Sequence, residues 1–435
     1  MKEGYKQTEI GVIPEDWDIG SLKEAFPRLD AGVSVNSDES AFSDYFVLKT
    51  SAVRNGIVNA KEAKPVVRAD YPRLKCPVKK GSIIISRMNT PAMVGACGFS
   101  AAEASNTFLP DRLWQIEPLS PDYDFQWLNY LLNTEKYSRA IRATATGTSN
   151  SMKNIAKDRL LEILIPKPPL PEQQCIAEAL SDMDELIALL EKLIAKKKAI
   201  KQGTMQELLT GKRRLPGFTG EWERKLFGDL FEICPNNAYT RDQLTIGGKI
   251  KNIHYGDILT KYGAYLDGNI ANIPTLEKSL EKKQYAEKAF VQDGDIIIAD
   301  TAEDLTVGKA VEIVNVSGKI LSGQHTFLCR PIIPFAPMYL GYYLNSADFH
   351  DQVVPYVTGT KVSSINKSSL CSLTVKYPDI PEQSAIAEIL SDTDKAILAL
   401  DERLAKARQV KHGMMQQLLT GKIRIIERRE TYKCV

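Results

Sequence analysis

The chain has 435 residues, of which 43% are hydrophobic and 25% are charged, and its formal net charge is +2. This length predicts two to four domains with substantial cores, and the near-balanced charge excludes a generally basic protein, so any basic surface must be local. The N-terminus lacks the apolar core of a signal peptide, and no apolar run is long enough to span a membrane.

The first segment, residues 1–167, mixes short β-branched runs with turn residues, which predicts an α+β domain. It opens with Gly11-Val12-Ile13-Pro14 and Trp17. The run Lys80-Gly81-Ser82 ahead of three isoleucines predicts a turn that enters a buried strand. Near the end of the segment, Thr146-Gly147-Thr148 matches Thr358-Gly359-Thr360 in the second half of the chain.

A long helix is predicted within residues 168–214. Its apolar residues follow steps of 4, 3, 4, 3 and 4, the spacing of a coiled-coil seam. Pro171 and Glu172 suit the first turn, and Gly211 suits the position just past the end. The seam residues are Ile176, Leu180, Met183, Ile187, Leu190 and Ile194.

The second half repeats the first, with residues 215–377 as a second domain, residues 378–425 as a second helix and residues 426–435 as a tail. Pro381 repeats Pro171 and Lys422 repeats Lys212, an offset of 210 at both ends (381 − 171 and 422 − 212). The fixed offset indicates that the length of the helix matters. The second seam comprises Ile386, Leu390, Ile397, Leu400 and Leu404.

The predicted fold class is therefore α+β. We expect two similar α/β domains, separated by two long antiparallel helices that form a coiled coil, with pseudo-two-fold symmetry, because tandem halves tend to pack as a homodimer would. Forty helical residues would give a rod of roughly 60 Å, so we interpret the helices as a ruler.

Two features of the helices have alternative interpretations. Gly203 and Gly413 weaken a helix by roughly 1 kcal/mol relative to alanine; they indicate either a close helix crossing or local distortion, or a contact surface for a partner. The basic run Lys192 to Lys201 is echoed by Arg403, Lys406, Arg408 and Lys411. It is either a solvated coiled-coil face or a surface that contacts spacer phosphates or acidic partner subunits.

Catalytic signatures are missing from the sequence. Neither a phosphate-binding Gly-x4-Gly-Lys-Ser/Thr loop nor a Gly-x-Gly-x-x-Gly fingerprint occurs, and the seven scattered cysteines predict free thiols in a reducing cytoplasm. The four histidines are isolated, so no metal site is predicted. One acidic group is either a nuclease-like metal site, a solvated loop or a set of acceptors for cytosine amino groups: Asp293, Asp295, Asp300, Glu303 and Asp304.

The candidate DNA-binding residues are of two kinds. Some are donor-rich loop residues that suit phosphate oxygens. Others are loop residues that suit base edges, since Arg or Lys can bind guanine, Asn or Gln can bind adenine, and Asp can bind cytosine. In the first domain they are Lys49, Arg54, Asn55, Arg87, Asn89, Thr146, Thr148, Ser149, Asn150 and Lys153. In the second domain they are Lys251, Asn252, His254, Tyr255, Asp300, Lys309, Gln324, His325, Thr358, Thr360, Lys361 and Ser363.

The two Pro-Glu-Gln helices, which alternate with two domains, resemble the DNA-specificity subunit of type I restriction-modification systems. The resemblance rests on Pro171-Glu172-Gln173 with Ile176-Ala177, their repeat from Pro381, the Gly11–Trp17 opening and Leu208-Leu209-Thr210-Gly211. It covers almost the whole chain. The second helix departs from the pattern, because Thr374–Asp379 replaces a more proline-rich run.

This resemblance implies a non-catalytic, cytoplasmic DNA-binding subunit used in phage defence. Each target-recognition domain would read one half of an asymmetric bipartite duplex target, with half-site centres about 34–36 Å apart. The helices would dock two modification (methyltransferase) subunits, and two restriction subunits would complete the complex. S-adenosylmethionine, ATP and Mg would be bound by those partners, with no cofactor on this chain. The alternative function is a non-catalytic coiled-coil adaptor that recognises no bases.

Overall fold

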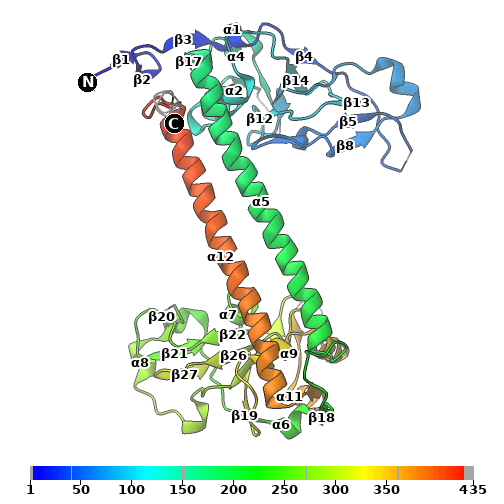
Figure 1. The fold of residues 1–435 in the computed structure, drawn as a ribbon, viewed down its shortest axis with the longest axis vertical. Helices are drawn as coiled ribbons and strands as arrows, with labels where there is room; N and C mark the ends of the chain where they lie inside the picture. Colours follow the sequence, from blue (N-terminus) through cyan, green and yellow to red (C-terminus); the bar gives the residue numbers. More distant parts are fainter. Residues whose placement is uncertain (1–2, 41, 148–151, 271, 360–361, 426–435) are drawn as a thin grey trace. The chain divides into compact units, whose positions relative to one another are not determined.

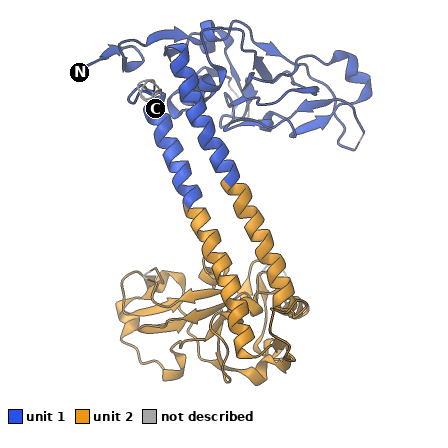
Figure 2. Cartoon of the chain, in the orientation of Figure 1, with its two compact units in different colours: residues 1–189, 403–435 blue, residues 190–402 orange. Residues whose placement is uncertain are grey.

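The computed structural model describes residues 3–40, 42–147, 152–270, 272–359 and 362–425. The chain forms two compact units, which Figure 2 shows in separate colours: residues 1–189 with 403–435, and residues 190–402. Each unit contains one α+β domain and parts of both long helices. The predicted domain boundaries follow the sequence repeat, whereas the compact units divide both helices.

Unit 1 is built on a mixed six-stranded sheet with helices packed against it (Figure 1). Its strand order is β4 (Asp30–Ala31), β14 (Leu113–Ile116), β10 (Ile83–Ser86), β12 (Cys97–Phe99), β7 (Gly56–Val58) and β6 (Val53–Arg54). The helices of this domain are α1 (Leu22–Ala25), α2 (Phe125–Leu132), α3 (Glu135–Ala143) and α4 (Lys157–Leu161).

Smaller sheets complete this domain. A four-stranded sheet has the order β8 (Ala63–Pro65), β5 (Phe46–Leu48), β13 (Ala104–Phe108) and β9 (Pro77–Val78). A three-stranded sheet joins β11 (Met88–Asn89), β16 (Lys153–Ile155) and β15 (Ala145–Thr146). Two-stranded sheets pair β1 (Tyr5–Thr8) with β2 (Gly11–Pro14), and β3 (Asp18–Ser21) with β17 (Leu164–Lys167).

Unit 2 repeats this plan. Its main sheet has the order β19 (Phe231–Cys234), β28 (Thr326–Pro331), β24 (Ile296–Ala299), β26 (Ala310–Val314) and β22 (Tyr265–Asp267). A second sheet has the order β20 (Leu244–Thr245), β23 (Thr275–Leu276), β21 (Ile250–Ile253) and β27 (Lys319–Ser322). The pair β25 (Thr301–Ala302) with β29 (Ser363–Ser364) matches β11 with β16, and the pair β18 (Glu223–Leu226) with β30 (Thr374–Tyr377) matches β3 with β17. The helices are α6 (Phe227–Leu230), α7 (Tyr255–Thr260), α8 (Lys278–Glu281), α9 (Tyr339–Leu344), α10 (Ala347–Val353) and α11 (Lys367–Cys371).

The predicted turn before the buried strand is confirmed at Gly81, and a matching turn occurs at Gly294. Gly81 and Gly294 have φ angles of 79° and 82°, a left-handed conformation that glycine adopts without a steric penalty. Each turn leads into an isoleucine-rich strand, β10 or β24, whose residues are completely buried. The triple isoleucines therefore form the centre of each main sheet.

The two long helices are confirmed, as α5 (Leu170–Leu208) and α12 (Ile380–Leu418), each of 39 residues. Each ends with a glycine in the left-handed conformation, with φ of 71° at Gly211 and 69° at Gly421, as a helix terminus requires. Within each unit the helices run antiparallel, because the first turn of one contacts the segment that follows the other, as the ion pairs described below establish.

The first residues of each predicted seam are buried by the neighbouring domain, which the heptad spacing did not predict. Ile176 and Leu180 are buried in the core of the first domain together with Leu418 and Leu419, so the domain itself covers the start of α5. Ile386 and Leu390 pack in the same way in unit 2. Of the remaining seam residues, Leu190, Ile194, Ile397 and Leu404 are buried, whereas Met183, Ile187 and Leu400 are half-buried.

The first interpretation of the mid-helix glycines is wrong. Both helices run through Gly203 and Gly413 without a break. A Cβ atom added at either glycine would meet no described atom within 4 Å. Neither a distortion nor a close helix crossing therefore explains these residues.

Candidate nucleic-acid interface

The Pro-Glu-Gln motif at the start of α5 is bound by residues from both ends of the chain. The Glu172 side chain is fully buried and accepts hydrogen bonds from Nε1 of Trp17 (2.8 Å) and Nη2 of Arg424 (2.8 Å). Arg424 also donates to both carboxylate oxygens of Asp16, at 2.8 and 2.7 Å. The Arg424 hydrogen bond is the main reason that the pKa of Asp16 lies below its ordinary value. We call this group the Arg424–Glu172 clasp.

The same clasp recurs in unit 2 with an offset of 210 residues. Arg214 donates from Nε and Nη2 to the two oxygens of Glu382, both at 2.6 Å, and the Glu382 side chain is 1% exposed. Such bidentate pairs are geometrically specific. Trp222 lies beside Arg214, but its buried Nε1 has no described acceptor, unlike that of Trp17. We call this group the Arg214–Glu382 clasp.

The glutamine of the motif attaches each globular domain to its helix. Oε1 of Gln173 accepts from the backbone N–H of Asp124, at the start of α2. In unit 2, Oε1 of Gln383 accepts from the N–H of Ala336, ahead of α9. Both glutamines are buried. The motif is therefore a structural joint, with one residue bound to the end of the other helix and the next bound to the domain.

A second joint lies further along each helix. In unit 2, Asp394 accepts from the hydroxyl of Tyr342 (2.8 Å) and from Nζ of Lys201 (2.6 Å), and the ammonium lies 5.4 Å from the tyrosine ring centre. The joint connects α9, α12 and α5. Burial raises the pKa of Tyr342, so the hydroxyl remains a donor.

Unit 1 contains the matching triad. Asp184 accepts from the hydroxyl of Tyr130 (2.7 Å) and from Nζ of Lys411 (2.5 Å). Neither interpretation of the basic run applies to Lys201 and Lys411, since both lysines are partly buried and paired within their own unit. Sequence reasoning missed both triads, although the 210-residue offset of Asp184 and Asp394 was visible.

Several candidate residues of the first domain gather around the end of β10. Arg87 follows this strand directly, and Asn89 on β11 pairs with Lys153 on β16. Thr146 on β15 pairs with Asn154 of the same strand β16. Arg87, Asn89, Thr146 and Lys153 therefore belong to one small sheet and its entry.

Arg87 has an incomplete set of partners. Its guanidinium carbon lies 5.4 Å from the ring centre of Trp114, and its buried Nε has no acceptor among the described residues. An unsatisfied buried donor costs roughly 1–3 kcal/mol. Such a residue requires a functional or structural explanation.

The remaining first-domain candidates lie at β6 and just after β5, a strand of the four-stranded sheet. Lys49 is 3.4 Å from Glu39, and Arg54 donates to Glu62 at 3.1 Å. Asn55 has φ of 52° and precedes Gly56 in the two-residue turn between β6 and β7. Asn-Gly is the preferred sequence of this turn, which gives Asn55 a structural explanation beside the proposed one.

In the second domain, the candidates at the end of β24 form an aromatic and polar cluster. His325 has φ of 56°, and its ring lies 5.4 Å from that of Tyr255. Nδ1 of His325 is 3.5 Å from Oδ1 of Asp300. Nε2 of His325 is 3.3 Å from the side-chain nitrogen of Gln324, and the His254 ring packs on Tyr255 at 4.6 Å. Thus five candidates lie together.

Three second-domain candidates instead bind their own domain. Nζ of Lys251 donates to the carbonyl of Gly268, Nζ of Lys309 to the carbonyl of Leu259, and Asn252 is fully buried. Burial lowers the pKa of Lys309. Of the other candidates, Thr358 and Ser363 lie at the β25–β29 pair. Thr148, Ser149, Asn150, Thr360 and Lys361 lie outside the described residues.

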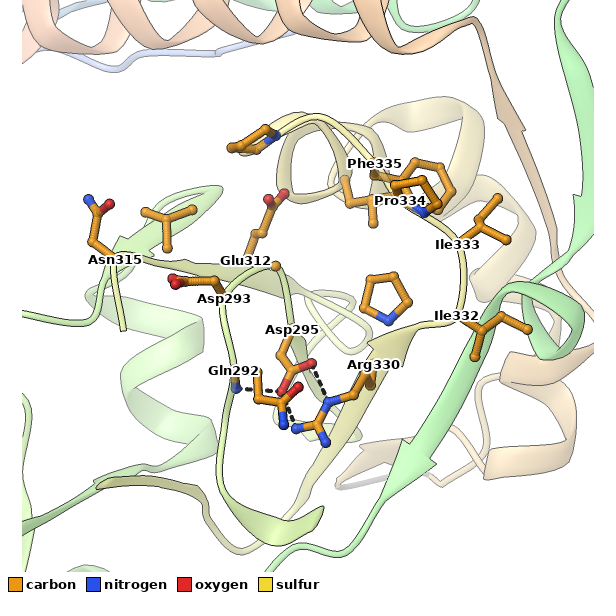
Figure 3. A pocket seen from close by; sticks show the side chains of 15 residues that line it. Gln292, Asp293, Asp295, Glu312, Asn315, Arg330, Ile332, Ile333, Pro334 and Phe335 are labelled. Atoms are coloured by element: carbon orange, nitrogen blue, oxygen red, sulfur yellow. Dashed lines mark hydrogen bonds and ion pairs between the residues drawn. The ribbon is translucent and has the colours of Figure 1, made fainter. Parts of the chain in front are cut away.

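The acidic group is divided between the two ends of β24. Asp295 precedes the strand and forms a buried pair with Arg330, with separations of 2.9 and 2.7 Å (Figure 3), whereas Asp300 follows the strand. Asp304 accepts from Thr306. No group of residues suited to bind a metal ion occurs in the described parts of the chain, so no structural support exists there for the nuclease-like interpretation.

A cavity of 630 Å³ lies at the Asp295 end of β24 (Figure 3). Glu312 lines it, and burial raises the pKa of this carboxyl to about 7. Its two oxygens accept from the backbone N–H groups of Met338 and Gly341 at 2.6 and 2.8 Å, so Glu312 stabilises the start of α9. The cavity therefore lies at the other end of the strand from the base-reading candidates.

The six described cysteines are free thiols, in agreement with the sequence. The described helices include none that combines the length and apolarity of a bilayer-crossing segment.

Comparison with known proteins identifies related chains. The family model described as "Type I restriction modification DNA specificity domain" matches residues 14–199 and again 219–408. A putative type I restriction enzyme MjaX specificity subunit from Methanocaldococcus jannaschii is 25% identical, over 98% of this chain and 97% of its own length. The MjaVIII specificity subunit of the same organism is 23% identical with the same coverage.

Solved structures share the fold. The crystal structure of a type I restriction-modification S subunit from M. genitalium aligns with a TM-score of 0.56 and 17% identity, over 96% of this chain and 99% of that chain. A chain from a study of complex assembly and conformational transition in the type I R-M system aligns with a TM-score of 0.54 and 15% identity, over 94% and 99%.

Proposed function

Because this chain belongs to the type I restriction modification DNA specificity family, we propose that each of its two domains reads one half of a bipartite DNA target. The chain is a DNA-sequence-recognition subunit of a type I restriction-modification system. Specificity subunits are in general non-catalytic, which agrees with the lack of catalytic signatures in the sequence. Catalytic activity would then belong to the partner subunits.

The observation that carries the proposal is a duplicated framework with different loop residues. In both units the helix ends are joined by the same clasp, and the domain is attached to the helices through the same Tyr-Asp-Lys triad. At the end of the central strand, however, the first domain presents Arg87 and the second presents Asp300. Two similar scaffolds with different reading residues support an asymmetric target whose halves are unrelated in sequence.

We further propose that α5 and α12 set the spacing between the two half-sites and dock two modification subunits. Two restriction subunits would complete the assembly, in the cytoplasm. S-adenosylmethionine would be bound by the modification subunits, and ATP and Mg by the restriction subunits. One structural neighbour belongs to a type I R-M system whose complex assembly has been studied, which supports partners of this kind.

Mapping methylated adenines tests this function. The full chain would be expressed with its modification subunit, and the methylated motif read from genomic DNA. We expect one bipartite motif, of which one half changes when residues 20–165 are exchanged for those of another specificity subunit. Changes in both halves would refute the assignment of one domain to one half-site. An adaptor without base recognition would give no motif at all.

A further inference from the structure

Arg87 and Asp300 occupy the same backbone position in the two domains. Each follows the central strand of the main sheet and precedes the short strand β11 or β25. The N–H of Arg87 donates to the carbonyl of Arg112 (3.0 Å), and the N–H of Asp300 donates to that of His325 (3.1 Å). These hydrogen bonds place the two residues at equivalent sites.

A second pair of backbone hydrogen bonds fixes the same equivalence. The carbonyl of Arg87 accepts from the N–H of Ile155 (2.8 Å), and the carbonyl of Asp300 accepts from that of Ile365 (2.9 Å). Both isoleucines are buried in their domain cores. The main chain at this position is therefore held from both sides in each domain, and only the side chain differs.

The two side chains have opposite hydrogen-bonding chemistry and incomplete partners. Arg87 presents only donors, and its buried Nε has no acceptor among the described residues. Asp300 presents acceptors; it accepts from Oγ1 of Thr301 (2.7 Å) and faces His325 across 3.5 Å, and its side chain is 21% exposed. Each retains capacity for a further hydrogen bond.

The residues beside this position also differ in chemistry. In the first domain, the carbonyl that accepts from the N–H of Arg87 belongs to Arg112, whose side chain is exposed. In the second domain, His325 occupies the equivalent position. His325 is held at a φ of 56°, a conformation that costs free energy for a residue other than glycine and is often found at functional sites. The difference between the domains is thus concentrated at one edge.

We propose that this is one base-reading position used twice: Arg87 addresses a guanine in one half of the target, and Asp300 a cytosine in the other. The inference rests on the proposed function of the chain. A guanidinium can donate to O6 and N7 of guanine, whereas a carboxylate can accept from the N4 amino group of cytosine. The shared backbone position presents either side chain to the major groove.

Binding of phosphate by Arg87 is the competing explanation. A phosphate contact would position the protein without distinguishing bases, and its loss would weaken binding to all sequences alike. A carboxylate at the equivalent position argues against it, because Asp300 would repel a phosphate. The base-reading role accounts for both residues with one geometry.

The test compares variants of the full chain, in complex with its modification subunit, by selection from a library of random DNA duplexes. Arg87→Gln and Asp300→Asn introduce side chains that pair with adenine through N6 and N7. We expect each variant to change preference toward adenine at one position of one half-site, with the original base losing its advantage by on the order of ten-fold or more. Matched controls are Arg28→Gln and Asp351→Asn, which remove exposed charges elsewhere in the same units and should leave the motif unchanged.

The outcomes separate this proposal from the proposed function. If the wild-type complex selects no bipartite motif, the proposed function itself fails. If the wild type selects a motif but Arg87→Gln lowers affinity uniformly, or alters both halves, the base-reading assignment is overturned while the function stands.

Conservative variants provide a test that remains valid if Arg87→Gln or Asp300→Asn fails to fold. Arg87→Lys keeps a donor and should retain guanine, and Asp300→Glu keeps an acceptor and should retain cytosine. Loss of the preferred base in a conservative variant whose thermal unfolding matches the wild type would contradict the proposal.

Discussion

Replacement of Arg424 by glutamine should destabilise unit 1 strongly. Glu172 is fully buried, and the substitution leaves its carboxylate with Nε1 of Trp17 as its remaining described side-chain donor. Removal of one partner of a buried ion pair costs roughly 3–5 kcal/mol, because an uncompensated charge stays buried. Loss of the contact to Asp16 adds little, since that side chain is 57% exposed and such pairs contribute at most about 1 kcal/mol.

The double variant Arg424→Gln with Glu172→Gln isolates this cause. A neutral residue at position 172 can still accept from Trp17 while it no longer buries a charge. The double variant should therefore be more stable than Arg424→Gln alone. Arg214→Gln provides the matched change in unit 2, where Nε1 of Trp222 does not donate to Glu382 and has no acceptor in the described part of the chain.

Amide hydrogen exchange is the suitable measurement, because the free energy of local opening is reported segment by segment. We expect faster exchange in residues 170–180 and 415–424 of Arg424→Gln, while residues 380–390 keep their protection. Arg214→Gln should give the reverse pattern. A change of less than about 0.5 kcal/mol in either variant, the range of ordinary surface substitutions, would refute the argument that the clasps hold the helix ends.

Three other positions give predictions that can be measured. Tyr342→Phe removes the hydroxyl that donates to Asp394 and should lower the free energy of unfolding by roughly 1.5–3 kcal/mol, measured by denaturant titration. Gly203→Ala meets no steric obstacle and should raise the free energy of unfolding by roughly 1 kcal/mol. Weaker binding of the modification subunit to this variant in a pull-down titration would support the partner-surface interpretation, and unchanged binding would contradict that interpretation. Burial raises the pKa of Glu312 from its ordinary 4.5 to about 7, so between these pH values the folded state binds a proton that the unfolded state has lost. The free energy of unfolding should therefore fall by roughly 3 kcal/mol as pH rises from about 4.5 to 7. Thermal unfolding of Glu312→Gln should lack this pH dependence, and a pH profile equal to that of the wild type would contradict the assignment.

The sequence predicted the elements that depend on local patterns. Heptad spacing located both long helices, and Gly211 and Gly421 marked their ends because only a left-handed residue fits there. The turn at Gly81 ahead of the isoleucine strand was equally visible. These signals come from residues close together in the chain, where backbone geometry determines the residue type.

Contacts between distant residues were not predictable in the same way. Arg424 and Glu172 are 252 residues apart, and the sequence indicated only that Glu172 suits the first turn of the helix. The offset of 210 from Arg214 to Arg424 could have revealed the clasp, since a contact made twice must be repeated on both of its sides. The equivalence of Arg87 and Asp300 did have a sequence signal, because each residue lies six positions after the glycine of the matching turn, Gly81 or Gly294 (87 − 81 and 300 − 294).

The two copies share the residues that join domain and helices and differ in the residues at the end of the central strand. The Arg-Glu pair of the clasp and the Asp-Lys pair of the triad recur at an offset of 210, and the triad tyrosine at 212 (342 − 130), because each unit needs the same joint between domain and helices. At the end of β10 and β24, backbone hydrogen bonds define the position, and the same bonds form with either arginine or aspartate there. Substitution at this position therefore changes hydrogen-bonding chemistry without disturbing the joints. This physical independence is what the proposed reading of different bases by two copies of one scaffold requires.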